Sequence, residues 1–144
     1  MKKKFKFLEH TADVKIKAWG DTCKEAFEQA ALALQATISP EIDRIALKTK
    51  KKIEVTAEDQ EALLFDFLSE FLYIFDVEKL IFGEIRVNTL EKHDDNLSLK
   101  ATLKGEKFDL EKHEIGTEVK AITYSYMKIE EKKDITEIEV VLDI

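Results

Sequence analysis

The stretch DQEALLFDFLSEFLYIF, residues 59–75, is the strongest indicator of fold in this chain of 144 residues. Its large apolar side chains recur at intervals of three and four residues, which gives a helix one continuous apolar face. These side chains belong to Leu63, Leu64, Phe67, Leu68, Phe71, Leu72 and Phe75. Glu58 or Asp59 is placed to begin this helix. We interpret the stripe as hydrophobic core rather than as a ligand site.

A second helix is predicted upstream of this stretch. Thr22 and Glu25 have the spacing of a capping box, which pairs side chains with the unbonded N–H groups of a first helical turn. Ser39-Pro40 is typical of a helix end. Between these signals the apolar residues follow helical spacing and form one face: Ala26, Phe27, Ala30, Ala31, Leu34 and Ile38.

The remaining patterned segments predict β-strands. Apolar residues alternate around Phe5 and Phe7 and in Val14–Ala18, and Lys52–Thr56 is also β-prone. Two segments flank the turn-forming Asp94-Asp95-Asn96 and predict an antiparallel hairpin: Leu80–Leu90 and Leu97–Leu103. Val119–Met127 and Ile135–Ile144 complete the set. Many strands with only two long helices predict an α+β fold, one domain over residues 1–144, with a mainly antiparallel sheet and both helices packed on one face.

Composition narrows the functional classes. The net charge of −7 argues against a surface that grips nucleic acid by itself. We interpret the basic runs Lys2–Lys6 and Lys48–Lys52 as solvated strand ends. The single cysteine, Cys23, excludes an intramolecular disulfide and a multi-cysteine zinc cluster. Neither a membrane span nor the apolar run of a signal peptide is apparent, so we expect a cytoplasmic protein.

Familiar catalytic motifs are missing from the sequence. The four glycines are scattered singly, so there is no phosphate-binding loop, and there is no Gly-x-Ser-x-Gly nucleophile elbow. His10, His93 and His113 lack the short helical spacings of zinc sites. Nothing in the sequence by itself requires an enzyme.

Two acidic segments are candidates for chemistry. Asp13 lies between the first two predicted strands, where it is either a turn residue that bonds local backbone or a ligand for a hard cation. If the last strand is held in the sheet, Asp143 and the terminal carboxylate of Ile144 become fixed. Beside Asp13 they would form a cluster of three negative charges, which favours binding of calcium, magnesium or manganese. The sequence does not show that these ends meet.

Lys120 is the third candidate. It interrupts an apolar, β-prone run within Gly116–Tyr124. It is either an ordinary strand residue that faces solvent or a cation held near a phosphate or carboxylate.

These segments carry a family resemblance. The chain resembles archease along almost its whole length, in His10-Thr11-Ala12-Asp13, in the helix from Glu61-x-Leu63-Leu64 to Glu70-x-Leu72-Tyr73, in Gly116-Thr117-Glu118-Val119-Lys120-Ala121-Ile122-Thr123-Tyr124, and in the final Asp143-Ile144. The resemblance implies a small α+β accessory protein that is not itself a ligase. It implies a partner, an RtcB-type RNA-splicing ligase of tRNA splicing. The accessory protein would promote guanylylation of this ligase with GTP and a divalent metal, and would allow the ligase multiple turnovers.

The resemblance also implies roles for particular residues. It places a divalent metal ion, expected to be calcium, on Asp13, Asp143 and the carboxylate of Ile144, and the lysine of ligase activation on Lys120. RNA would be contacted only indirectly, through the ligase. Ser125 departs from the pattern, because many relatives carry histidine there, so no role is assigned to it. The alternatives are a metal-dependent enzyme that uses the Asp13 and Asp143 cluster, and a general chaperone or RNA-binding module.

Overall fold

The computed structural model describes residues 1–8 and 13–144. Its helices are α1 (Cys23–Ile38), the short 3₁₀ helix η1 (Ile42–Arg44) and α2 (Gln60–Glu78). Its strands are β1 (Phe5–Leu8), β2 (Val14–Gly20), β3 (Thr49–Ala57), β4 (Leu80–Lys92), β5 (Leu97–Lys107), β6 (Ala121–Glu131) and β7 (Thr136–Asp143). In this part of the chain no helix is both long and apolar enough to cross a membrane.

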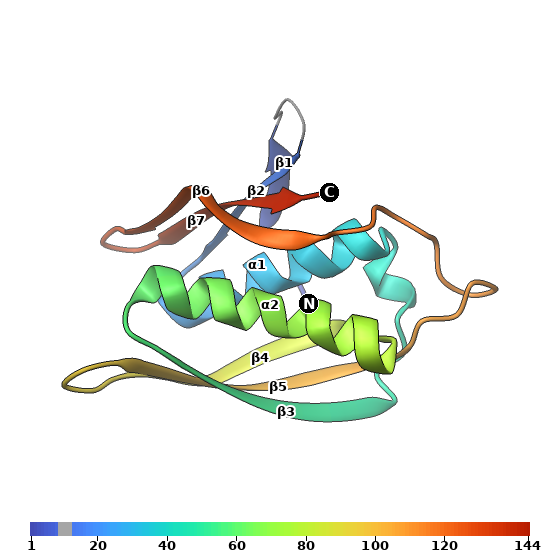
Figure 1. Cartoon of the computed structure of the whole chain (residues 1–144), viewed down its shortest axis with the longest axis horizontal. Coiled ribbons are helices and arrows are strands. Elements are labelled where there is room, and N and C mark those ends of the chain that lie inside the picture. The colour runs from blue at the N-terminus through green and yellow to red at the C-terminus, as the bar shows by residue number, and fades with distance from the viewer. Residues whose placement is uncertain (9–12) are drawn as a thin grey trace.

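The strands form two antiparallel sheets. One has the order β1-β2-β7-β6 and the other has the order β3-β5-β4. The helices α1 and α2 lie between them, with β6 and β7 on one side and β3, β4 and β5 on the other (Figure 1). Each sheet therefore buries one face against the helices, and a single hydrophobic cluster includes side chains from both sheets and both helices.

The helices begin where the capping residues predict. The Thr22 hydroxyl accepts a hydrogen bond from the Glu25 N–H at 3.1 Å, and the Asp59 carboxylate accepts one from the Ala62 N–H at 2.8 Å. Most of the stripe on α2 is core, as predicted, because Leu63, Leu64, Phe67, Leu68 and Phe71 are fully buried. Its last two members, Leu72 and Phe75, are only partly buried.

The predicted α+β class, the antiparallel pairing and the two helices packed on a sheet face are confirmed. The division of the strands into two sheets is an additional feature that the sequence analysis did not predict.

Polar side chains of α1 explain how the helix can lie against the edge strand β4. Gln35 Oε1 accepts a hydrogen bond from the Phe82 N–H and Glu28 Oε2 accepts one from the Val87 N–H, both at 2.8 Å, which satisfies edge groups that would otherwise be buried without a partner.

Candidate functional site

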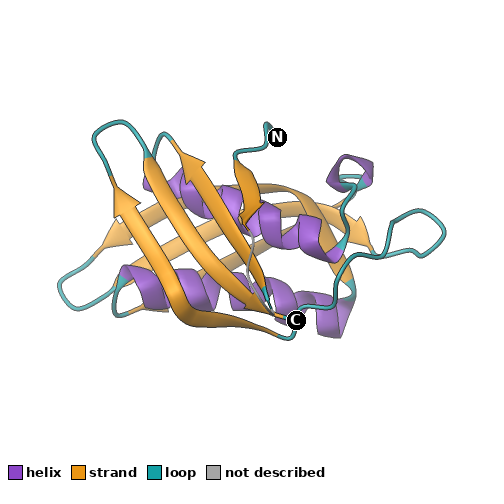
Figure 2. Cartoon of the chain, turned by 90° about the horizontal axis from the view of Figure 1, so that it is seen from above, coloured by secondary structure: helices purple, strands orange, loops and turns teal. Residues whose placement is uncertain are grey.

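The pairing register brings the predicted site residues to one end of the four-stranded sheet. The last pair between β2 and β7 is Val14 with Leu142, so Asp13 and Asp143 each lie one residue beyond it. On the other side of β7, Ala121 pairs with Asp143, so Lys120 lies one residue beyond that pair. Segments more than 100 residues apart in sequence therefore converge where the chain ends at Ile144 (Figure 2).

Lys120 is fixed by its backbone at this end of the sheet. Its N–H donates to the carbonyl oxygen of Asp143 at 2.7 Å. Its side chain is exposed, as is that of Asp143, whereas Asp13 is partly buried. The ammonium group is consequently presented to solvent beside the end of β7, not buried in the sheet.

The segment before Lys120 is anchored on the C-terminus of α1. The Gly116 N–H donates to the Ile38 carbonyl at 2.9 Å, and the Thr117 N–H donates to the Thr37 carbonyl at 2.8 Å. These two carbonyls belong to the last turn of the helix, which has no intrahelical donors for them. A Cβ on residue 116 would come within 2.2 Å of the Thr37 oxygen, so glycine is required by close approach. The Gly116–Lys120 segment is thus held at both ends by main-chain hydrogen bonds.

The donor set predicted for this end of the sheet would suit a hard divalent cation. It consists of two side-chain carboxylates, from Asp13 and Asp143, and the terminal carboxylate of Ile144, all of which are oxygen ligands of the kind preferred by calcium and magnesium. Within residues 1–8 and 13–144, no three His, Cys, Asp or Glu side chains form a metal-binding group. The predicted set does not require one, because its third member is a main-chain carboxylate. Of the motif His10-Thr11-Ala12-Asp13, only Asp13 lies within the described residues.

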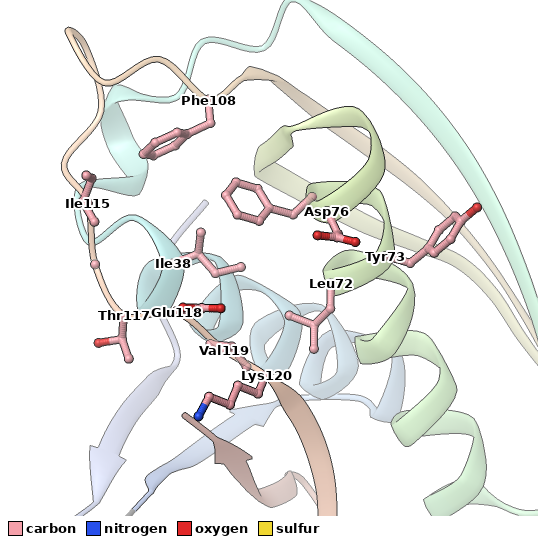
Figure 3. Close-up of a pocket in the computed structure, with 12 residues that line it drawn as sticks. Ile38, Leu72, Tyr73, Asp76, Phe108, Ile115, Thr117, Glu118, Val119 and Lys120 are labelled. Atoms are coloured by element: carbon pink, nitrogen blue, oxygen red, sulfur yellow. The ribbon is translucent and has the colours of Figure 1, made fainter.

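A cavity of about 620 Å³ opens beside Lys120, between α2 and the segment that precedes β6 (Figure 3). Its walls are mainly apolar, from Ile38, Leu72, Phe75, Phe108 and Val119. Asp76 and Glu118 add carboxylates, and Lys120 lies at its margin. The sequence analysis missed this cavity, because the residues that line it come from four separate segments.

A buried polar network supports the loop on one side of this cavity, and it too was missed. The Asp109 N–H donates to His113 Nδ1 at 2.9 Å, which leaves the proton on Nε2, and Nε2 donates to Glu106 Oε2 at 2.8 Å. The His113 side chain is fully buried and stacks against Phe108 with ring centroids 5.7 Å apart. The role of His113 is therefore structural.

Glu106 is the centre of this network. Burial raises the pKa of its carboxyl, but hydrogen bonds from Lys112, the Ala46 N–H and His113 outweigh that effect and lower the pKa to about 2. The ion pair with Lys112 is short, at 2.6 Å between Nζ and Oε2. The charged carboxylate thereby ties the 109–113 loop to residue 46, in the segment between η1 and β3.

Ser125 lies in a bulge of β6. The register with β7 shifts between Thr123 and Lys128, and Tyr126 within the shift has a left-handed φ of 59°. This conformation is uncommon for a bulky residue, and such strain is often found at functional positions. Tyr124 beside it stacks on Phe65 of α2 at 4.3 Å between ring centroids. No side-chain contact of Ser125 assigns it a role.

Comparison with known proteins agrees with these features. The archease protein family matches residues 5–144. The protein archease of Pyrococcus furiosus is 48% identical over 132 residues, which cover 92% of each chain. That of Methanosarcina acetivorans is 40% identical over 142 residues, which cover 99% of this chain and 97% of its own.

Solved structures give the same answer for the fold. The solution structure of protein 1598 from Methanobacterium thermoautotrophicum has a TM-score of 0.81 at 33% identity, and covers 97% of this chain and 98% of its own. A crystal structure from Thermotoga maritima, described as an archease and possible chaperone, has a TM-score of 0.59 at 24% identity and supports the fold alone. The family match includes both Asp13 and Asp143, and the chain belongs to the archease family.

Proposed function

We propose that this protein is an accessory factor of an RtcB-type RNA-splicing ligase in tRNA splicing, and that it promotes guanylylation of the ligase and repeated turnover without joining RNA itself. The observation that carries the proposal is the convergence of Asp13, Asp143, the Ile144 carboxylate and Lys120 at one exposed end of a sheet. Membership of the archease family supports an accessory role.

We propose that Asp13, Asp143 and the carboxylate of Ile144 hold a divalent ion, and that this ion is calcium. Three carboxylates brought together repel one another unless a cation or protons are taken up, which supports the assignment. When bound, the ion would supply positive charge close to the negatively charged groups of a nucleotide-transfer site. The family resemblance and the chemistry of the donors support this site.

Lys120 would act on the partner rather than on the fold of this chain. Its backbone is fixed by the bond to Asp143, but its ammonium group is exposed and makes no ion pair with any residue that the structure describes. A lysine with a fixed backbone and an exposed ammonium group is suited to contact with a phosphate or carboxylate of the ligase. Nucleotidyl transfer requires such charge neutralisation at the phosphates.

The second candidate function is that of a general chaperone. It is favoured by the exposed apolar side chains Tyr73 and Ile115 beside an apolar cavity, because exposed apolar surface is typical of protein-binding sites. The third, a metal-dependent enzyme, would use the same carboxylates but would have to work without the ligase.

A time course of ligase guanylylation separates these candidates. Purified ligase is incubated with labelled GTP and divalent metal, with and without this protein, and RNA joining is followed in parallel. Faster guanylylation and repeated joining only when both proteins are present support the proposal. RNA joining by this protein alone would establish an enzyme. Protection of an unrelated protein from aggregation, without stimulation of the ligase, would favour the chaperone.

A further inference from the structure

The cavity beside Lys120 has the features of a pocket that binds a side chain of another protein. One wall is the C-terminal half of α2 and the other is the segment from Ile115 to Lys120 (Figure 3). Ile115 is 67% exposed and Tyr73 is 62% exposed at its margins, although both are large apolar side chains. An apolar cavity with exposed apolar margins leaves hydrophobic surface in water that a bound group would cover.

The two acidic side chains of the cavity indicate what would cover it. Asp76 comes from α2 and Glu118 from the facing segment, and both are exposed (Figure 3). Neither forms a hydrogen bond or an ion pair with another described residue, whereas Glu78, two residues after Asp76, is paired with Lys51 at 2.8 Å. Two carboxylates beside an apolar cavity attract a group that is apolar at its base and cationic at its edge.

We propose that this cavity docks the ligase partner through a protein segment that presents a bulky apolar side chain next to a lysine or an arginine. The apolar side chain would enter between Phe75, Phe108 and Val119. The cationic neighbour would pair with Asp76 and Glu118. This inference rests on the proposed function, which it deepens by separating where the partner is held from where it is activated.

The position of Lys120 supports this division of roles. Lys120 lines the cavity and also bonds through its N–H to Asp143, so a segment bound in the cavity lies directly beside the candidate metal site. The cavity is preformed, because Phe75 and Phe108 contact edge to face at 5.8 Å between centroids and Gly116 is anchored to α1. A preformed cavity loses little conformational entropy on binding.

Charge reversal tests the cationic half of the proposal. The double variant Asp76→Lys/Glu118→Lys changes two exposed side chains without ion pairs, so the fold should be kept. Asp94→Lys/Asp95→Lys in the exposed β4–β5 turn makes the same change in net charge away from the cavity. Each is titrated into purified ligase while guanylylation is measured. We expect the cavity variant to raise the concentration for half-maximal stimulation by about tenfold, with the maximum unchanged, and the control to stay within about twofold of the wild type.

A matched pair tests the apolar half. Ile115→Ser removes an apolar side chain from the cavity margin, and Leu110→Ser removes one of nearly equal exposure, 68%, from the same loop outside it. Only Ile115→Ser should weaken binding of the ligase. If the cavity variants and their controls titrate alike while the wild type stimulates the ligase, the docking inference is overturned and the proposed function stands. Failure of the wild type to bind or stimulate the ligase would overturn both. A wild-type dimer that Ile115→Ser converts to monomer in ultracentrifugation would assign the cavity to a second copy of this chain and overturn the inference.

Discussion

Substitution of Gly116 by alanine should destabilise the protein and reduce its activity, although alanine adds only one methyl group. Gly116 does not have a positive φ, so the requirement for glycine does not come from backbone strain. It comes from contact, because the added Cβ would lie 2.2 Å from the Thr37 carbonyl oxygen and 2.9 Å from that of Ile38. Both atoms belong to backbone and cannot rotate away. The segment must therefore move by about 1 Å to restore an ordinary contact distance.

The size of the effect follows from the bonds that such a movement breaks. The hydrogen bonds from Gly116 to Ile38 and from Thr117 to Thr37 are 2.9 and 2.8 Å long and would be lost together. Each contributes about 1 kcal/mol, and the stranded carbonyls of a buried helix end add to the cost. Alanine restricts the unfolded chain, which returns about 0.4–1 kcal/mol. We expect a net loss of about 2 kcal/mol, or about 5–8 °C in Tm for a domain of this size.

The assay is urea unfolding of Gly116→Ala beside a matched control, Gly83→Ala. A Cβ at Gly83 would meet its nearest neighbours, Ile42 and Ile45, at 3.3 Å, which a small shift can accommodate. We expect the control to lose less than about 1 kcal/mol. Because Gly116 also positions Lys120, stimulation of the ligase should fall in Gly116→Ala and remain in Gly83→Ala. Equal stability of the two variants would show that the anchor on α1 does not hold the segment, and the argument from contact distance would be wrong.

Three further predictions concern single groups. Lys120→Ala should keep the free energy of unfolding within about 0.5 kcal/mol of the wild type but lose ligase stimulation. Lys120→Arg should not restore the stimulation fully, since a planar guanidinium places charge differently. Full stimulation by a folded Lys120→Ala would refute the role. Glu106→Gln should lower the free energy of unfolding at neutral pH. Because the pKa of Glu106 in the folded protein is about 2, below the ordinary value of 4.5, the difference in this free energy between wild type and variant should shrink as pH falls from about 4.5 towards 2. A difference in urea unfolding that is independent of pH would exclude the charged network. One glycine added after Ile144 should weaken calcium binding in calorimetry, because it replaces the carboxylate by an amide and moves the new charge about 3.5 Å. A tag before Met1 should leave the affinity for calcium unchanged. Equal affinities of the two extended proteins would show that the terminal carboxylate is not part of the site.

The helices and the β4–β5 hairpin could be predicted because their signals are local. Apolar spacing over a few turns defined α2, and a turn-forming cluster between two β-prone segments defined the hairpin. The hairpin strands are longer than expected, since they extend to Lys92 and Lys107. The predicted strand Val119–Met127 differs from β6, which runs from Ala121 to Glu131, because the bulge around Tyr126 breaks the alternation of side chains.

Pairing between distant segments could not be predicted from local patterns. β2 pairs with β7 across most of the sequence, and this pairing decides that there are two sheets and that Asp13 lies near Asp143. The contact between Glu106 and His113 was missed for a related reason, since it lies in an irregular loop without periodicity. Composition and spacing identify residue types suited to a site, whereas the register of the sheet brings them together.

That register has an energetic consequence at the candidate metal site. The pair that would follow Val14 and Leu142 is Asp13 with Asp143, and like charges directly opposite each other destabilise an antiparallel pair. The carboxylate of Ile144 adds a third charge. A bound cation should remove this cost and stabilise the fold by mass action, by about 2.7 kcal/mol at a calcium concentration of 100 times Kd.

Asp13→Asn should therefore reduce the stability that the protein gains when calcium is added. The stability of each protein without calcium is the baseline for the comparison. With saturating calcium the wild type should gain stability and the variant should gain much less, because a neutral amide oxygen is a poorer ligand for a divalent ion. Thermal unfolding with chelator and with added calcium measures both differences on the same samples. If wild type and Asp13→Asn show the same increase in Tm with calcium, the ion is bound elsewhere, and the convergence of Asp13 with Asp143 would need an explanation other than metal binding.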